Sequence, residues 1–562
     1  MADKEASDEG KIPLEYFYHW ERTSPERVFM TQPVGGGAVR DITWREAGDQ
    51  SRRMATWLKA QGWPTGSKVA ILGKNSAHWV LADLAIMMSG FVSVPMYSTF
   101  NADALRYILE HSEARACFIG KLDETASLKD GVPAGMPLIA LPLAPPLEAL
   151  SWDALIAAST ALAGEPVAQP QDLWTIVYTS GTTGRPKGVM LSFAGLKWAG
   201  GPALRRISFS TEDRFISYLP LAHIMERVVL EMTAIHHGCR IFFAESQDTF
   251  LADLQRARPT MFLSVPRLWV KFQQGVHSKL PPEKLQRLLK IPLVGYLVRR
   301  KILKGLGLEH CRFAGSGAAP LPADVLRWYR NLGLDLLEGY GMTENFAISH
   351  AILPGTSHPG TVGIPYNGVE SRIDPDTGEV QMRSPAVMVG YYKDPAGTAA
   401  AFTADGWLRT GDKGVVDGNG CLRITGRVKD IFKTSKGKYV APAPIEDLLV
   451  THPAVEACVV TGANFAQPLA LLMLSLEAMA AAKGDGRKVL VQSLEAHLKA
   501  VNTQLDAHEK LDCVALVTTM WTPENGFVTP TLKVKRARIE EAYAGHYEGW
   551  IRERKTVVWA QV

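Results

Sequence analysis

The chain of 562 residues is too long for a single compact core, and its length predicts roughly two to four structural units. A hydrophobic fraction of 46% with 21% charged residues is typical of a soluble globular enzyme and excludes the fibrous and disordered classes. The net charge of +4 gives no indication of a nucleic-acid partner. The six cysteines lack the spacing of a zinc site or a disulfide framework, so we expect a reducing, cytoplasmic location.

The first part of the chain predicts alternating strands and helices. Residues 1–9 are acidic and lack the apolar core of a signal peptide. The apolar window 79–97 is interrupted by Asp83, Gly90 and Pro95, which favours a buried helix and a strand over a membrane span. We also expect helices over 41–58 and 101–110, and strands over 68–75, 91–95, 116–119 and 173–178.

Alternation at this pitch predicts an α/β fold of parallel sheets with helices on both faces. Residues 133–170 are rich in Pro, Ala and Leu and predict a connector over the surface.

The stretch after the strand 173–178 has the composition of a phosphate-binding loop. Its glycines let the backbone approach phosphate oxygens, while its hydroxyls and one ammonium can donate to them. The P-loop motif is excluded because Lys187 is followed by Gly188. The candidate residues are Thr179, Ser180, Gly181, Thr182, Thr183, Gly184 and Lys187. The stretch resembles the signature of the adenylate-forming superfamily, which includes acyl-CoA synthetases.

Two further stretches of the large first part match that superfamily in order. The first, 218–227, contains His223, although a lone histidine is more often structural. The second, 315–321, looks like a dinucleotide fingerprint, but Pro320 replaces its third small residue. By resemblance, this stretch lines the adenine and acyl pockets through Gly317, Ala318 and Ala319.

The stretch 338–345 carries the residues suited to the nucleotide and its metal. Tyr340 offers a flat face for adenine, Thr343 a hydroxyl for the α-phosphate and Glu344 a hard oxygen ligand for Mg²⁺. The alternative is a bare turn with a solvated acid. The nucleotide candidates here are Glu338, Gly339, Tyr340, Gly341 and Thr343, and the metal candidates are Thr179 and Glu344.

Later stretches match the ribose-binding and hinge regions of the superfamily. Asp412 supplies a carboxylate for the ribose hydroxyls, with Ile424 and Arg427 near the ribose, and Lys429 resembles the hinge. Residues 417–420 predict a hairpin turn, a helix is expected at 443–450 and a strand at 457–460. These features place a domain boundary between an N-terminal domain, 1–425, and a mobile C-terminal domain, 426–562.

The end of the chain contains two candidates for the mobile catalytic lysine of the superfamily. Lys533 and Lys535 each have an arginine three residues later, and the Thr-Pro-Thr before Lys533 favours Lys533. The resemblance makes Lys533, Thr343, Glu344 and His223 catalytic, and it assigns CoA binding to Ser435, Lys436, Gly437 and Lys438.

Over roughly residues 14–548 the chain looks most like long-chain fatty acyl-CoA synthetases. The resemblance implies a large domain of parallel and mixed sheets with flanking helices, a small barrel-like subdomain and a small α+β C-terminal domain. It also implies that ATP, Mg²⁺ and CoA are used to convert a fatty acid to acyl-AMP and then to a thioester. Met225 and Asn345 depart from the common pattern and leave acyl-chain length open. Loading of an acyl carrier protein and a non-catalytic regulator remain alternatives.

The segment 284–304 holds seven Lys/Arg and no Asp/Glu among many apolar residues. Pro292 and Gly295 are expected to break it into two short helices. Such a segment can lie at a membrane interface, or its apolar side can pack on the core. A location associated with membranes, and a homodimer, are left open.

Overall fold

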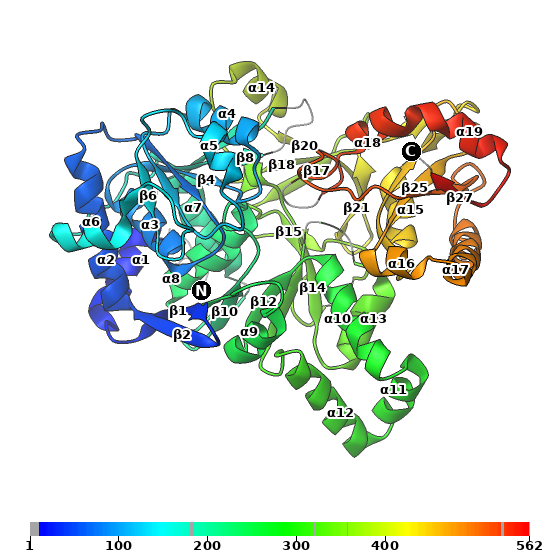
Figure 1. The fold of residues 1–562 in the computed structure, drawn as a ribbon, viewed down its shortest axis with the longest axis horizontal. Coiled ribbons are helices and arrows are strands. Elements are labelled where there is room, and N and C mark those ends of the chain that lie inside the picture. The colour runs from blue at the N-terminus through cyan, green and yellow to red at the C-terminus, as the bar shows by residue number, and fades with distance from the viewer. Residues whose placement is uncertain are drawn as a thin grey trace. The chain divides into compact units, whose positions relative to one another are not determined.

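The computed structural model describes residues 10–179, 185–205, 207–317, 319, 321–356, 358–529 and 533–560. Its contacts form two compact units (Figure 1). The first comprises Met1–Ala319, Ala323–Ser371 and Met382–Leu408, and the second Pro320–Pro322, Arg372–Gln381 and Arg409–Val562. The domain boundary between residues 425 and 426 stays a prediction.

The largest sheet of the first unit has eight strands in the order β19-β9-β8-β4-β3-β5-β6-β7. Strands β3 to β8 run parallel to their neighbours, whereas β9 is antiparallel to both β8 and β19. The strands are β3 Lys68–Leu72, β4 Val92–Met96, β5 Cys117–Ile119, β6 Leu138–Ala140, β7 Leu150–Ser151, β8 Leu173–Thr179, β9 Lys187–Ser192 and β19 Gly390–Tyr391. The four strand predictions in this region are confirmed. The surface connector over 133–170 is wrong in part, because β6, β7 and a helix, α6 (Trp152–Ala158), lie within it.

Two further sheets complete the parallel and mixed layers of the first unit. One has the order β10-β11-β1-β2, and the other β12-β13-β14-β15-β16. The strands are β1 Val28–Gly35, β2 Ala38–Thr43, β10 Arg214–Ser217, β11 Arg240–Phe243, β12 Met261–Ser264, β13 Phe313–Ser316, β14 Leu336–Tyr340, β15 His350–Ala351 and β16 Ile364–Pro365. Each of these sheets is parallel at one side and antiparallel at the other. These sheets confirm the α/β fold class.

A small four-stranded sheet, β17-β18-β20-β21, corresponds to the predicted barrel-like subdomain. The C-terminal part of the second unit adds a four-stranded sheet, β24-β25-β26-β27, and the pair β22-β23. The strands are β17 Glu370–Ile373, β18 Glu379–Arg383, β20 Leu408–Val416, β21 Leu422–Arg427, β22 Phe432–Lys433, β23 Tyr439–Val440, β24 Val455–Thr461, β25 Leu469–Leu474, β26 Val514–Val517 and β27 Val557–Ala560.

Helices flank these sheets (Figure 1). Those of the first unit are α1 Pro13–Thr23, α2 Trp44–Ala60, α3 Ala77–Met88, α4 Ala102–Ser112, α5 Ala126–Gly131, α7 Phe193–Gly200, α8 Thr233–His237, α9 Phe250–Ala257, α10 Pro266–Lys279, α11 Pro282–Leu289, α12 Pro292–Gly305, α13 Ala323–Asn331 and α14 Pro395–Ala401. Those of the second are α15 Pro442–Leu449, α16 Leu476–Ala481, α17 Asp485–Asn502, α18 Arg536–Tyr543 and α19 Tyr547–Arg552. Short 3₁₀ helices are η2 Pro202–Leu204, η4 Thr343–Asn345 and η5 Ala544–His546, and η3 Glu226–Met232 is a π-helix. Within the described residues, no helix is both long and apolar enough to cross a bilayer.

Helix α3 is the centre of the largest core. All its residues are buried, and it contacts β3 and β4 of one sheet and β1 of another. Its single acidic residue, Asp83, accepts a hydrogen bond at 2.5 Å from Arg227 of the π-helix η3. The Arg227 guanidinium also donates to Thr175 on β8 and Ser93 on β4. This buried cation therefore ties η3 to the central strands, and η3 begins three residues after His223.

The break expected in the segment 284–304 occurs at Pro292, which begins α12, but Gly295 lies inside that helix. A Cβ atom at Gly295 would be 2.7 Å from the carbonyl oxygen of Leu289. The missing side chain therefore lets the first turn of α12 pack on the end of α11, and the glycine serves packing instead of ending a helix.

Candidate active site

Strands β8 and β9 bring the two described ends of the phosphate loop together. Thr179 ends β8 and pairs in register with Lys187, which begins β9. Ser180, Gly181, Thr182, Thr183 and Gly184 lie outside the described residues. Because the strands are antiparallel neighbours, the Thr179 hydroxyl and the Lys187 ammonium flank the predicted loop.

Lys187 lies between an acid and an aromatic ring. Its Nζ is 3.3 Å from Asp394 Oδ2 and 4.8 Å from the centre of the Tyr391 ring. A hydrogen bond from the Gly397 backbone, together with Lys187, holds the pKa of Asp394 below its usual value. Asp394 is solvent-accessible, so this ion pair is weak and the ammonium is available to a polyphosphate.

Tyr391 links the phosphate loop to the predicted metal ligand. Its hydroxyl donates to Glu344 Oε1 at 2.9 Å, and its ring lies under the Lys187 ammonium. Burial and the adjacent Glu344 carboxylate raise the pKa of Tyr391 well above its ordinary value, so the phenol remains a donor. Sequence reasoning missed Tyr391. Its signal is the pairing of Tyr391 with Val189, which brings together strands about two hundred residues apart.

The turn that carries Thr343 and Glu344 is held by its own side chains. The Asn345 side chain accepts a hydrogen bond from the Met342 backbone at 2.9 Å and is 1% exposed. The backbone N–H of Met388 donates to the Glu344 carbonyl at 2.7 Å. A Cβ at Gly341 would lie 2.3 Å from Ala347, so only glycine fits there. Asn345 therefore supports the turn.

His223 lies at the start of a short helical segment. Its Nδ1 accepts from the Met225 backbone at 3.2 Å, which leaves the proton of the neutral imidazole on Nε2. The preceding loop is held by Glu226, whose carboxyl accepts from the Ser217 hydroxyl at 2.8 Å and the Tyr218 backbone at 3.1 Å. Full burial raises the pKa of Glu226 to about 8. The π-helix that follows is a geometry frequent at functional sites.

Three predicted stretches meet around Gly317. A Cβ at this position would lie 3.5 Å from the Gly339 carbonyl and 3.8 Å from Met225 Sδ. Met225, Gly317 and Gly339, one residue from each of these stretches, are therefore adjacent in the first unit. Glu338 is buried on β14, the Tyr340 and His350 rings are 6.2 Å apart, and Ala319 is exposed. Ala318 lies outside the described residues.

In the second unit, the predicted ribose residues form one pair across two strands. Asp412 on β20 pairs in register with Arg427 on β21, and Arg427 Nε is 3.2 Å from Asp412 Oδ1. Ile424 lies on the same strand as Arg427 and is half-buried. The pair presents a carboxylate beside a guanidinium, a set that can bind hydroxyl groups.

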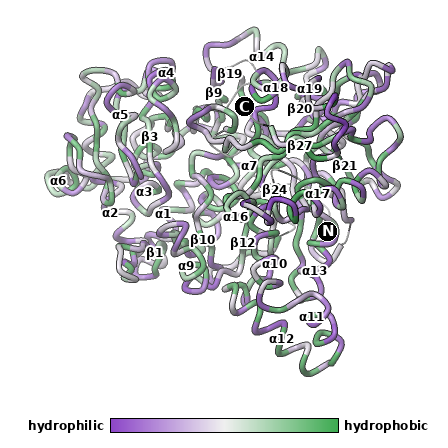
Figure 2. Tube along the Cα trace, turned by 45° about the vertical axis from the view of Figure 1, so that its right-hand side comes forward, coloured by the Kyte–Doolittle hydropathy of each residue, from purple (hydrophilic) through white to green (hydrophobic). Residues whose placement is uncertain are grey.

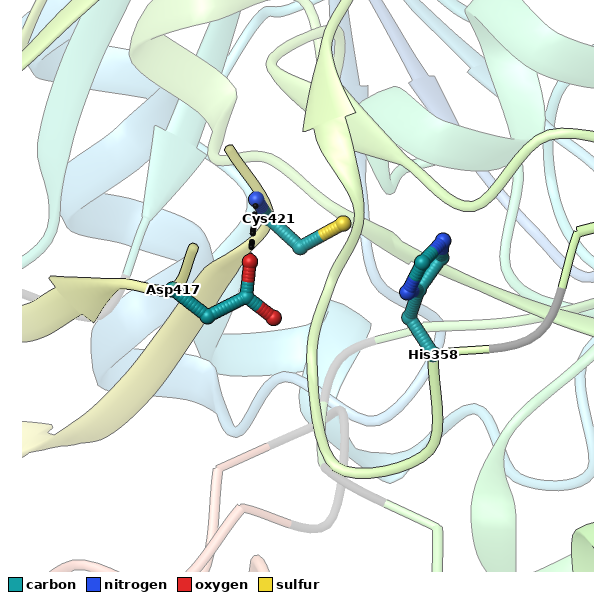
Figure 3. Close-up of side chains that lie close together, drawn as sticks. All are labelled: His358, Asp417 and Cys421. Atoms are coloured by element: carbon teal, nitrogen blue, oxygen red, sulfur yellow. Dashed lines mark hydrogen bonds between the residues drawn. The ribbon is translucent and has the colours of Figure 1, made fainter. Parts of the chain in front are cut away.

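The turn between these strands is the hairpin expected at 417–420. Figure 3 shows the Cys421 backbone N–H donating to Asp417 Oδ1, at 2.9 Å. Asn419 donates to the same oxygen, also at 2.9 Å. His358, also drawn there, belongs to the first unit. The Asp417 side chain thus closes the turn by accepting from the backbone N–H groups that follow it, as aspartates do in Asx-turns.

The predicted hinge and CoA residues are exposed. Lys429 lies in the turn that follows β21, and Ser435, Lys436, Gly437 and Lys438 form the tip between β22 and β23. Gly437 has a φ of 76°, which favours glycine, and its N–H donates to the Thr434 carbonyl. The tip is closed at its base by backbone hydrogen bonds and carries two exposed ammonium groups.

The two lysine candidates differ in their surroundings. The backbones of Lys533 and Thr529 are hydrogen-bonded at 2.8 Å, the Lys533 N–H donates to the Thr529 hydroxyl at 3.1 Å, and Lys533 is exposed. Lys535 precedes α18 and donates its N–H to the Phe527 carbonyl. The exposed position of Lys533 supports its choice as the mobile lysine.

Arg536 anchors this loop, and sequence reasoning missed its role. Its guanidinium donates to Glu446 Oε1 and to the Val460 carbonyl, both at 2.6 Å, and lies 3.8 Å from Asp430 Oδ2. Burial raises the pKa of Glu446, but the adjacent guanidinium opposes this shift. Arg536 thus joins the segment that carries Lys533 to helix α15 and to Asp430, the residue after Lys429.

Comparison with known families decides what these motifs belong to. The AMP-binding enzyme profile matches residues 17–392, and the profile of the AMP-binding enzyme C-terminal domain matches residues 429–551.

The chain belongs to the AMP-binding enzyme family.

Similar AMP-binding enzymes include relatives from bacteria and plants. The chain is 32% identical to the long-chain-fatty-acid–CoA ligase FadD15 of Mycobacterium bovis, over 94% of this chain and 95% of the relative. It is 32% identical to long chain acyl-CoA synthetase 6, peroxisomal, of Arabidopsis thaliana, over 90% and 81%. The fold matches the adenylation domain of the carboxylate reductase of Mycobacterium chelonae, with a TM-score of 0.82, 23% identity and coverage of 97% and 91%.

The oxygen donors of the first unit fit the magnesium ion that adenylate-forming enzymes are expected to use. Glu344 offers a carboxylate and Thr179 a hydroxyl, and both are the hard ligands that Mg²⁺ prefers. Tyr391 would hold the carboxylate in place from behind, as a second hydrogen-bonded group does at many metal sites.

The Glu344→Gln variant tests this assignment. The amide keeps the size of the side chain and removes the charge, so we expect the Mg²⁺ concentration for half-maximal adenylation to rise at least about tenfold. Because the amide oxygen can still accept the hydrogen bond from Tyr391, the melting temperature should change by only a few degrees. Mg²⁺ titrations of pyrophosphate release and thermal unfolding measure the two effects.

Tyr391→Phe is the matched control, since it retains the carboxylate and removes only the hydroxyl donor. It should show a smaller rise in the Mg²⁺ requirement. If Glu344→Gln unfolds, or if its Mg²⁺ requirement equals that of the parent, the carboxylate serves the turn and not the metal.

Proposed function

We propose that this AMP-binding enzyme activates a long-chain fatty acid with ATP to acyl-AMP and then transfers the acyl group to CoA, releasing AMP and pyrophosphate. The support comes chiefly from two relatives that match nearly the whole chain and are named long-chain-fatty-acid–CoA ligase and long chain acyl-CoA synthetase. The adjacent stretches around Gly317 and the Lys187–Tyr391–Glu344 contacts are consistent with a nucleotide site.

The fatty acid must be activated first, because hydroxide is a poor leaving group when a thiol attacks a carboxylic acid. A carboxylate oxygen attacks the α-phosphorus, the bond to the β-phosphate oxygen breaks, and pyrophosphate leaves. We assign Lys187 to the polyphosphate, Thr343 to the α-phosphate and Lys533 to the charge that develops on its oxygens. Bound Mg²⁺ would neutralise phosphate charge beside Glu344.

His223 and the ribose pair have positioning roles in this proposal. Nε2–H of His223 can donate to the fatty carboxylate or to the adenylate oxygen, since Nδ1 is engaged by the Met225 backbone. Asp412 accepts from the ribose hydroxyls, and Arg427 holds that carboxylate. Fixed donors and acceptors of this kind lower the barrier by orienting the reactants.

In the second half-reaction, the thiol sulfur of CoA bonds to the acyl carbon, the bond from that carbon to the AMP oxygen breaks, and AMP leaves. We assign the exposed tip Ser435–Lys438 to CoA, whose phosphates suit its two ammonium groups. Lys533 is needed only for the first step, so we propose that residues 426–562 rotate about Lys429 between the steps.

Product analysis tests the proposal. The enzyme is given ATP, Mg²⁺ and fatty acids of several lengths, with either CoA or a phosphopantetheinylated carrier protein, and products are identified by mass spectrometry. We expect acyl-CoA from long chains. Formation of a thioester with the carrier protein alone would favour the carrier-protein ligase, and absence of both acyl-AMP and any thioester would contradict the proposal.

A further inference from the structure

The tip formed by α11 and α12 exposes apolar side chains to solvent. The exposed fractions are 73% for Leu293, 56% for Tyr296, 56% for Leu297, 51% for Ile291 and 37% for Val294. By contrast, Leu285, Leu306 and Leu308 are buried and fix the two helices to the rest of the first unit. The apolar residues from Ile291 to Leu297 named above therefore face solvent and do not pack on the core. In Figure 1 and Figure 2, α11 and α12 lie beyond α10 and α13, away from the five-stranded sheet.

The same segment is strongly basic. Its cations are Lys284, Arg287, Lys290, Arg299, Arg300, Lys301 and Lys304, and it contains no acidic residue. All of 284–304 is described, and none of these seven cations has an ion-pair partner in the described chain. All but Arg299 are exposed. An uncompensated positive field therefore surrounds the apolar tip.

Helix α12 separates the two kinds of side chain along its length. Leu293, Leu297, Lys301 and Lys304 follow at spacings of three or four residues and so lie along one face. The apolar pair is in the N-terminal half, and the cations are in the C-terminal half. From Leu293 to Arg300 the helix rises about 10 Å, close to the depth to which interfacial segments enter the headgroup region.

We propose that the α11–α12 tip docks on an anionic lipid bilayer, with Leu293, Tyr296 and Leu297 in the interface and the cations at the lipid phosphates. A second copy of this chain fits less well, because a symmetric contact would bring the two positive surfaces together. The docking itself does not depend on the proposed function. The benefit of docking rests on the proposed function, because long-chain fatty acids partition into bilayers and docking would place the enzyme at their source.

Vesicle co-sedimentation without ATP tests docking separately from catalysis. The parent is compared with Arg300→Glu/Lys301→Glu/Lys304→Glu and with Leu293→Ser/Leu297→Ser, on phosphatidylcholine vesicles with and without 30 mol% phosphatidylglycerol (about a third anionic lipid). We expect salt-sensitive binding of the parent only to the anionic vesicles. The charge reversal should lower the partition coefficient at least about 100-fold. The matched control is Lys129→Glu/Lys483→Glu/Lys510→Glu, which makes the same change in net charge at exposed residues elsewhere.

The control should bind like the parent, and both α12 variants should retain parental activity on detergent-dispersed fatty acid. If the control lost as much vesicle binding as the charge reversal in α12, net charge alone would explain the loss and the specific site would be overturned. Parental binding by either α12 variant, or no binding by the parent, would also overturn it. A parent dimer that Leu293→Ser/Leu297→Ser converts to monomer would instead assign the tip to self-association. If the parent formed no acyl-CoA, the proposed function would be rejected and the result on vesicle binding would still stand.

Discussion

The Lys533→Ala variant should release pyrophosphate at least about 1000-fold more slowly than the parent when it is given ATP and a long-chain fatty acid. Lys533 is exposed, its backbone is hydrogen-bonded to Thr529, and its ammonium is assigned only to the charge that develops on the α-phosphate. Thiolysis of supplied acyl-AMP by CoA should therefore proceed within about threefold of the parent rate, as expected for an interaction made in one transition state only.

Lys535→Ala is the matched control for this variant. Lys535 also has an arginine three residues later, but it directly precedes α18 and is partly buried. Its removal should leave pyrophosphate release close to the parent rate. Equal loss of both half-reactions in Lys533→Ala would contradict the assignment, and the reverse pattern between the two variants would make Lys535 the catalytic lysine.

The Lys429→Pro variant should lower overall acyl-CoA formation at least about 100-fold while adenylation persists. In the described structure the backbone N–H of Lys429 donates no hydrogen bond, whereas those of Val428 and Asp430 do. Proline therefore removes no such bond and acts by fixing φ at the proposed pivot. Pyrophosphate release and acyl-CoA formation, measured separately, resolve the two steps.

Lys429→Ala removes the charge and retains backbone freedom, so it should leave both half-reactions near the parent rate. Acyl-CoA formation at the parent rate by Lys429→Pro would exclude Lys429 as the hinge. An equal loss of both half-reactions would indicate that proline disturbs the fold of the second unit, which thermal unfolding would reveal.

The sequence predicted the long elements well and the short ones poorly. Strand β8 and helix α3 were predictable because long apolar runs identify buried elements. Strands β6 and β7 have three and two residues, too few to show a period, so the sequence pattern of 133–170 predicts a connector instead. The prediction that Gly295 breaks the helix is wrong, because the role of this glycine is set by its close contact with the carbonyl of Leu289 and not by its low helix propensity.

The candidate site shows the same division. Motif residues such as Lys187 and Glu344 could be named from local pattern, whereas Tyr391 becomes visible only when β19 pairs with β9. The anchoring role of Arg536 likewise becomes visible only through its contacts with Glu446 and Asp430. Residues whose role is to hold others depend on contacts between distant parts of the chain, which periodicity does not contain.

The buried Arg536 guanidinium has a mechanical consequence. It joins the lysine loop to helix α15 and to Asp430, the residue next to the proposed pivot. Lys533, three residues before Arg536, is therefore connected through this buried side chain to the residue beside the proposed pivot. On the proposed hinge, a single rotation about Lys429 withdraws the Lys533 ammonium and exposes the acyl carbon to the thiol.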